Sequence, residues 1–160
     1  MNAERTRRPR VLIIDDNVAI IAALEEFFRS RSYEVFSSTE PVTCPLYGKT
    51  AESCDKVRPC ADIMLVDLHM PRMSGAELLK QQAEGGCKLG IDNKAIMSSY
   101  TAGIYEDMIR DLGCSLFYKP LLLSALPAWL TEREKHFDLS QPLADLLGDP
   151  SRLPSDPFAQ

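Results

Sequence analysis

Three apolar runs in this chain stop abruptly at charged residues, and this feature constrains its fold more than any other. The runs and the charges that follow them are VLII before Asp15 and Asp16, IMLV before Asp67, and LFY before Lys119. A strand inside a parallel sheet is buried on both faces, so it reads as a continuous apolar run. Ligand sites in open α/β sheets lie just beyond the carboxyl ends of such strands. We therefore expect the charged side chains to meet at one sheet edge. Because like charges held close repel, a metal cation is expected among them.

The periodicity of the apolar residues predicts alternating strands and helices. Strands are expected at residues 10–14, 33–37, 62–67, 94–97 and 116–118, and helices at 18–31, 74–84, 102–112 and 122–136. Such alternation favours a parallel sheet with helices on both faces. A chain of 160 residues is long enough for one core and one domain.

Residues 41–60 and the two ends of the chain lack this pattern. The internal segment contains three prolines and three cysteines, so we expect it to be irregular, with at most a short helix over residues 51–58. Residues 1–8 are expected to form a solvated basic arm. Residues 137–160 are expected to be a proline-rich tail, too short for a DNA-binding output domain, in which residues 143–148 form one amphipathic turn that docks on the domain.

Charge and hydropathy argue against several classes of protein. The net charge of −5 is unfavourable for a broad nucleic-acid-binding surface. No apolar run approaches the length that a bilayer requires, and no signal-peptide pattern precedes the first strand. We expect a cytoplasmic protein that neither binds nucleic acid directly nor inserts into a membrane.

Taken together and in order, four motifs resemble those of the receiver domain of a two-component response regulator. They are the acidic pair of VLIIDDN, the run DLHMPRMSG around Asp67, the strand end KAIMSSY, and the pair Lys119-Pro120. The resemblance implies a receiver domain over residues 9–136. It also implies a flavodoxin-like, doubly wound (βα)5 fold whose five-stranded parallel sheet has the order 2-1-3-4-5.

The resemblance also implies roles for the acidic residues. Asp67 would be the phosphoacceptor, and Asp16 would bind Mg²⁺ directly. Asp15 would act partly through water, and the backbone carbonyl of His69 would complete the protein ligands. Mg²⁺ suits such a site because it prefers octahedral oxygen coordination and keeps several waters. Considered alone, Asp15 and Asp16 could instead favour the start of the next helix.

Two further residues receive roles from the same resemblance. Lys119 would pair with Asp67 and then with the phosphoryl oxygens, and its bond to Pro120 would be cis. Ser98 would turn to hydrogen-bond the phosphoryl group, with Ser99 as the alternative in the neighbouring register. Leu116 stands where the family usually has a switch aromatic, which weakens the expected coupling between the hydroxyl and that position.

The resemblance implies a signalling switch and not an enzyme, apart from self-catalysed phosphotransfer and autodephosphorylation. A histidine kinase or a phosphotransfer protein would supply the phosphoryl group, and an unnamed protein would receive the signal. The chain would be a monomer or a weak dimer. A hydrolase of a related fold is disfavoured because such enzymes usually have a second acid where this chain has His69.

The cysteines leave one alternative open. Cys44, Cys54 and Cys60 could form a metal or redox-sensing module that works without phosphorylation, although their spacing is not a standard zinc pattern. Burial as small apolar side chains is the simpler expectation.

Overall fold

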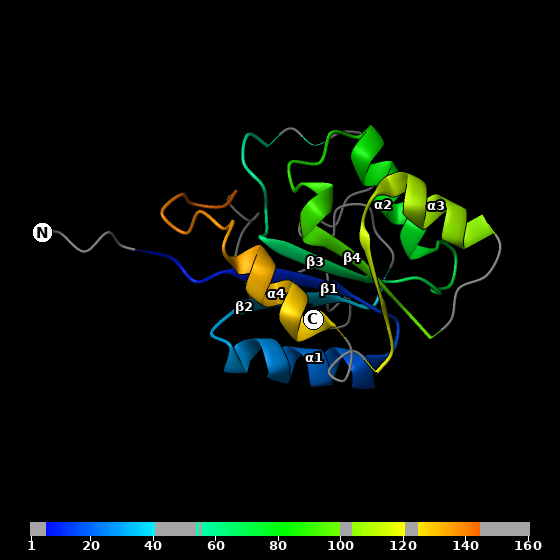
Figure 1. Ribbon diagram of the computed structural model, residues 1–160, viewed down its shortest axis with the longest axis horizontal. Helices are drawn as coiled ribbons and strands as arrows, with labels where there is room; N and C mark the ends of the chain where they lie inside the picture. The colour runs from blue at the N-terminus through cyan, green and yellow to red at the C-terminus, as the bar shows by residue number, and fades with distance from the viewer. Residues whose placement is uncertain (1–5, 41–53, 55, 100–103, 121–124, 145–160) are drawn as a thin grey trace, which may run out of the picture.

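The computed structural model describes residues 6–40, 54, 56–99, 104–120 and 125–144. Within them, five parallel strands form one sheet in the order β2-β1-β3-β4-β5, which confirms the expected fold (Figure 1). The strands are β1 (Arg10–Ile14), β2 (Glu34–Ser38), β3 (Ile63–Asp67), β4 (Lys94–Ser98) and β5 (Ser115–Tyr118). The central strands β3 and β4 are buried along their whole length, as their apolar composition predicts.

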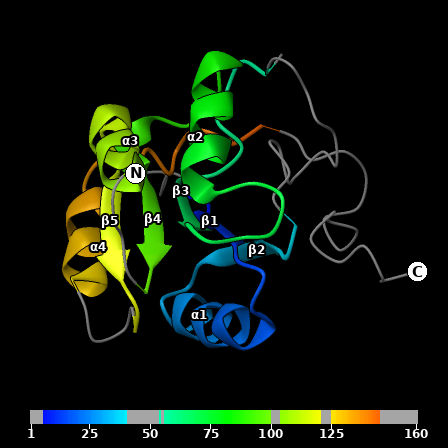
Figure 2. The ribbon, with the colours of Figure 1, turned by 90° about the vertical axis from the view of Figure 1, so that its right-hand side faces the viewer.

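Helices cover both faces of the sheet (Figure 2). They are α1 (Val18–Ser30), α2 (Gly75–Glu84), α3 (Ile104–Leu112) and α4 (Leu126–Glu134), with a short 3-10 helix, η1 (Ile91–Asn93), before β4. Successive side chains of a strand point to opposite faces. Accordingly, Leu12 and Ile14 of β1 pack in the core under α2 and α3, whereas Val11 and Ile13 pack in the core under α1 and α4.

Local signals in the sequence set the helix ends. The Asn17 side chain accepts hydrogen bonds from the first turn of α1, and Ser74 forms a reciprocal capping box with Glu77 at the start of α2. The helix α3 ends just before Gly113, which adopts φ +80° as a terminating glycine can. The expected starts near Val18 and Ser74 and the end at Leu112 are confirmed.

The boundaries of most elements differ from the expected ones by a few residues. Strand β2 begins and ends one residue later than expected, and α4 ends at Glu134, two residues early. Residues 54 and 56–60 contain no helix, and the rest of the expected short helix lies outside the described residues. Leu143 and Ala144 are buried, while the remainder of the expected docking turn lies outside them too. No described helix is both long and apolar enough to cross a bilayer.

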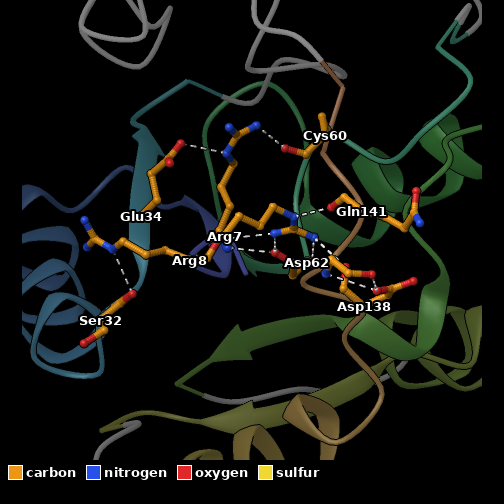
Figure 3. Close-up of polar contacts among 10 residues, drawn as sticks. Arg7, Arg8, Ser32, Glu34, Cys60, Asp62, Asp138 and Gln141 are labelled. Atoms are coloured by element: carbon orange, nitrogen blue, oxygen red, sulfur yellow. Dashed lines mark hydrogen bonds and ion pairs between the residues drawn. The ribbon is translucent and has the colours of Figure 1, made fainter. Parts of the chain in front are cut away.

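The expectation of a solvated arm is wrong for Arg7, although Arg8 is exposed (Figure 3). The Arg7 guanidinium donates to both carboxylate oxygens of Asp62, at 2.7 and 2.8 Å, and Asp62 is only 7% exposed. Arg7 also donates from its backbone to the Leu139 carbonyl at 3.0 Å and from its side chain to the Gln141 carbonyl at 2.6 Å. A buried carboxylate requires such partners, so Arg7 is held against the domain and ties the chain after α4 to it.

Candidate functional site

The carboxyl edge of the sheet gathers the acidic residues expected there. Asp15 and Asp16 follow β1, and Asp67 ends β3. In the parallel register Ile14 lies beside Val66, so the residues that follow them also lie side by side. One carboxylate oxygen from each of Asp15, Asp16 and Asp67 lies within 4.8 Å of the others. Within the described part of the chain, this is the one group of three or more acidic, histidine or cysteine side chains close enough to share an ion.

Lys119 reaches the acidic group from the far side of β4. Its Nζ lies 2.9 Å from Oδ1 of Asp67 and 3.0 Å from Oδ2 of Asp15. The backbone N–H of Lys119 donates to the Ser98 carbonyl at 2.8 Å, which holds the start of the loop against the end of β4. The bond from Lys119 to Pro120 is cis, as expected.

Burial and charge act in opposite directions on these groups. Asp15 and Asp67 are almost completely buried, and burial raises the pKa of both carboxyl groups, although Lys119 opposes the increase. Burial alone would lower the pKa of Lys119, but its hydrogen bonds and attraction to Asp67 and Asp15 outweigh burial and raise it. Three carboxylates and one ammonium group leave two negative charges. The oxygen donors and this excess charge fit a hard divalent cation such as Mg²⁺.

The oxygens of the three aspartates are not equally available. Oδ2 of Asp15 accepts from Lys119, and its Oδ1 accepts from the Asn17 N–H at 2.8 Å. Asp16 lies exposed at the mouth of the site. Asp67 uses Oδ1 for Lys119. An incoming cation therefore meets Asp16 and the second oxygen of Asp67 more readily than Asp15.

The two serine candidates differ in burial. Ser98 is 0% exposed at the end of β4, whereas Ser99 is exposed. On the neighbouring strand Leu116 is half-buried, and the Phe117 ring packs edge-on against Trp129 with centroids 5.3 Å apart. Tyr118 is 49% exposed.

Gly75, for which the sequence predicted no role of its own, allows α2 to begin against the end of β3. A Cβ on Gly75 would lie 2.4 Å from the Asp67 carbonyl oxygen and 2.9 Å from Cγ1 of Val66. Its N–H donates to the Leu68 carbonyl at 3.0 Å. The signal available in the sequence was a glycine at the first turn of a helix, where it is a poor helix former.

An open groove adjoins the acidic group on the side of the loop after β3. Among its lining residues are Asp16, His69, Arg72 and Tyr105. His69 is exposed, and its ring meets Tyr105 edge-on with centroids 5.7 Å apart. Arg72 has φ +74°, a left-handed conformation that no pattern in the sequence predicted.

The described cysteines do not assemble into a comparable site. Cys54, Cys60, Cys87 and Cys114 are half-buried, and Cys44 lies outside the described residues. Burial raises the pKa of the Cys114 thiol to about 11, so little reactive thiolate forms there at neutral pH.

Comparisons with known proteins agree with this geometry. A family model described as "Response regulator receiver domain" matches residues 11–91. The cell cycle response regulators CtrA of Brucella ovis and Brucella abortus are each 30% identical over 134 residues. The match covers 79% of this chain and 52% of each relative, so the chain spans about half the length of the curated relatives it matches.

Solved structures show the same fold. A CheY-like receiver domain protein from Methanospirillum hungatei is 24% identical with a TM-score of 0.59, and the match covers 82% of this chain and all of that one. A receiver protein from Pseudomonas putida is 20% identical with a TM-score of 0.59, covering 80% of this chain and 99% of that one. The structure of FixJ-N is 17% identical with a TM-score of 0.62, and the match covers 82% of this chain and 98% of that one.

Proposed function

The chain belongs to the response regulator receiver domain family, and on that premise we propose that Asp67 accepts a phosphoryl group and thereby switches the protein between two signalling states. Phosphoryl acceptance is general to the family. The observation that carries the assignment to Asp67 is its position. The carboxylate is buried, held 2.9 Å from Lys119, and close enough to Asp15 and Asp16 to share a cation.

The transfer requires a short path between two negatively charged groups. An Asp67 oxygen attacks the phosphorus of the donor and forms a new P–O bond. The donor's own bond to phosphorus breaks, and the leaving group keeps the electron pair. Lys119 holds the Asp67 carboxylate in place and then donates to the phosphoryl oxygens, where negative charge is spread during transfer. Bound Mg²⁺ would offset the remaining charge of the carboxylates and the phosphoryl group.

The available carboxylate oxygens support different roles for the three aspartates in binding the metal. Asp16 and the second oxygen of Asp67 would hold Mg²⁺ directly, with the backbone carbonyl of His69. Asp15 would act partly through water, because both of its oxygens already accept hydrogen bonds from Lys119 and Asn17. Several water ligands would remain, as Mg²⁺ usually retains them.

Ser98 would respond to the phosphorylation of Asp67. A buried hydroxyl group at the end of β4 lies next to the backbone link that holds Lys119, and this supports Ser98 over the exposed Ser99. Reorientation of Ser98 towards the phosphoryl group would alter the loop after β4. In this way a local charge change would bias a surface between two arrangements.

The proposal implies cytoplasmic protein partners at both ends of the reaction. A histidine kinase or a phosphotransfer protein would supply the phosphoryl group. The phosphorylated domain would then dock on a downstream protein. The domain itself would act as a switch and not as a classical enzyme. Its chemistry would be limited to its own phosphorylation and dephosphorylation.

Phosphorylation of the purified protein by acetyl phosphate tests the proposal. With Mg²⁺, intact mass should show one phosphoryl group per chain, and chelation of the metal should abolish it. The Asp16→Asn variant should lose the metal-dependent reaction, because it removes a direct ligand. Equal labelling with and without Mg²⁺ would contradict the metal assignment. The absence of label in the presence of Mg²⁺ would contradict the function.

A further inference from the structure

An ion pair between Glu40 and Arg72 crosses the mouth of the acidic site. Glu40 follows β2, and Arg72 lies in the loop after β3. Because β1 lies between these two strands, the pair joins the loops on either side of the end of β1, which Asp15 and Asp16 follow. The pair therefore lies across one approach to the site.

Glu40 is tied to the site through the backbone. Its N–H donates to the Ser38 hydroxyl at 3.1 Å, and that hydroxyl donates back to the Glu40 carbonyl at 3.0 Å. The Ser38 carbonyl accepts from the Asp15 N–H at 3.1 Å. These bonds place Glu40 in a compact turn two residues after Ser38, whose carbonyl pairs with the backbone of Asp15.

Arg72 is held in an unusual backbone conformation while its charge stays accessible. Its φ of +74° is unfavourable for a residue with a long side chain, and such strain often occurs at functional sites. The side chain is 70% exposed and lines the same groove as Asp16. The conformation thus presents an exposed guanidinium group at the rim of a negatively charged site.

The charge of the site creates a need for such a group. Asp15, Asp16, Asp67 and Lys119 together carry two excess negative charges, and Lys119 is already shared between two carboxylates. Acyl phosphates carry two negative charges at neutral pH, so the site repels them at a distance. A guanidinium group matches the geometry of phosphoryl oxygens.

We propose that Arg72 binds the dianionic phosphoryl group of the incoming donor, and that Glu40 restrains Arg72 until the donor displaces it. The proposal rests on the function assigned to Asp67 and adds a donor-binding residue to it. Binding exchanges one anionic partner of Arg72 for another. The phosphoryl group is thereby brought over Asp16 towards Asp67, while Asp67 and Lys119 carry out the transfer.

Rates of phosphorylation by acetyl phosphate at saturating Mg²⁺ test this proposal. Asparagine tolerates left-handed backbone, so Arg72→Asn removes the charge and keeps the loop conformation. It should slow the initial rate about three- to tenfold, as expected for one solvent-exposed charge in direct contact with a dianion, and added salt should narrow the difference in rate between the variant and the wild type. Arg72→Lys should retain most of the rate. Glu40→Gln should raise the rate, and should raise it less in the Arg72→Asn background.

A matched control separates this role from a general change in charge. Arg29→Gln removes a comparably exposed arginine, 60% against 70% for Arg72, that pairs with Glu25 on α1. It should leave the rate unchanged. Phosphoramidate, which carries less negative charge, should be less sensitive to Arg72→Asn than acetyl phosphate. The final stoichiometry should stay at one phosphoryl group in every variant.

The outcomes distinguish the two proposals. If the wild-type protein gains no phosphoryl group, the function assigned to Asp67 fails. If the wild type is labelled and Arg72→Asn reacts as fast as Arg29→Gln, the role of Arg72 is refuted while the function stands. An equal loss of rate with both donors would also overturn the proposal, because it would indicate a disturbed loop and not a lost charge.

Discussion

Gly75 determines how closely α2 can approach the residue that we propose is phosphorylated. Gly75→Ala should destabilise the fold by about 1–3 kcal/mol, the range for overpacking, since its Cβ would lie 2.4 Å from the Asp67 carbonyl oxygen. It should also slow phosphorylation, because relief of the clash displaces the end of β3. Urea unfolding and labelling rates measure the two effects. Gly90→Ala is the control, because a Cβ there meets nothing within 4 Å. Equal stability of the two variants would contradict this role of Gly75.

The charge of Asp67 should reduce the stability of the metal-free protein at neutral pH. Burial raises the pKa of this carboxyl group above its ordinary value of 3.8, and Asp15 adds to the increase against the effect of Lys119. The folded state therefore holds the proton more tightly than the unfolded state. This tighter binding stabilises the folded state fully below pH 3.8, and the stabilisation is lost as the pH rises through the raised pKa.

The Asp67→Asn variant, which stays uncharged, tests this sign. In chelator it should be more stable than the wild type at neutral pH, and the difference should shrink on approaching the ordinary carboxyl pKa of about 4. Added Mg²⁺ should also reduce the difference, because the wild type offers three carboxylates to the cation and the variant only two. Urea unfolding at two pH values measures this difference in stability between the variant and the wild type. A difference that widened as the pH fell would contradict the direction of the shift.

The sequence predicts the positions of some residues of the site but not of others. Asp15, Asp16, Asp67 and Lys119 each follow an apolar strand, and parallel strands end at the same edge of a sheet, so their meeting was predictable. The left-handed conformation of Arg72 depends on the path of a loop, which leaves no periodic signal in the sequence.

At the scale of elements, Arg7 joins the chain before β1 to the chain after α4. Asp62, directly before β3, is 7% exposed and also accepts from the Arg10 N–H at 2.8 Å. Arg7→Gln should lower the free energy of unfolding by about 3 kcal/mol, as expected when a buried carboxylate loses its charged partner. Hydrogen exchange should accelerate at Ala144, whose N–H donates to the Pro59 carbonyl.

An exposed pair provides the comparison for Arg7. Arg110→Gln, which breaks the surface pair with Asp107 on α3, should cost less than about 1 kcal/mol. A similar cost for Arg7→Gln, with unchanged exchange at Ala144, would indicate that Arg7 does not hold the segment after α4. The sequence did not predict this contact because an arginine-rich start has the same composition whether it is solvated or docked.

For the whole molecule, the order of elements predicted the architecture well. Alternating strands and helices gave the parallel sheet, and the resemblance of the motifs gave the order 2-1-3-4-5 that the structure confirms. Strand ends shifted by about one residue, because an apolar run does not mark where pairing begins. Contacts between distant segments, such as that of Arg7 with Gln141, depend on tertiary structure and could not be read from local pattern.

Chemical mapping of the phosphorylated residue tests the central claim most directly. Borohydride reduces an aspartyl phosphate to homoserine, so protein labelled with acetyl phosphate and Mg²⁺ can be reduced, digested and sequenced by mass spectrometry. The account predicts homoserine at Asp67 and at no other aspartate, with none formed in the Asp67→Asn variant. Homoserine at Asp15 or Asp16, or a phosphoryl group retained at full stoichiometry in Asp67→Asn, would contradict it.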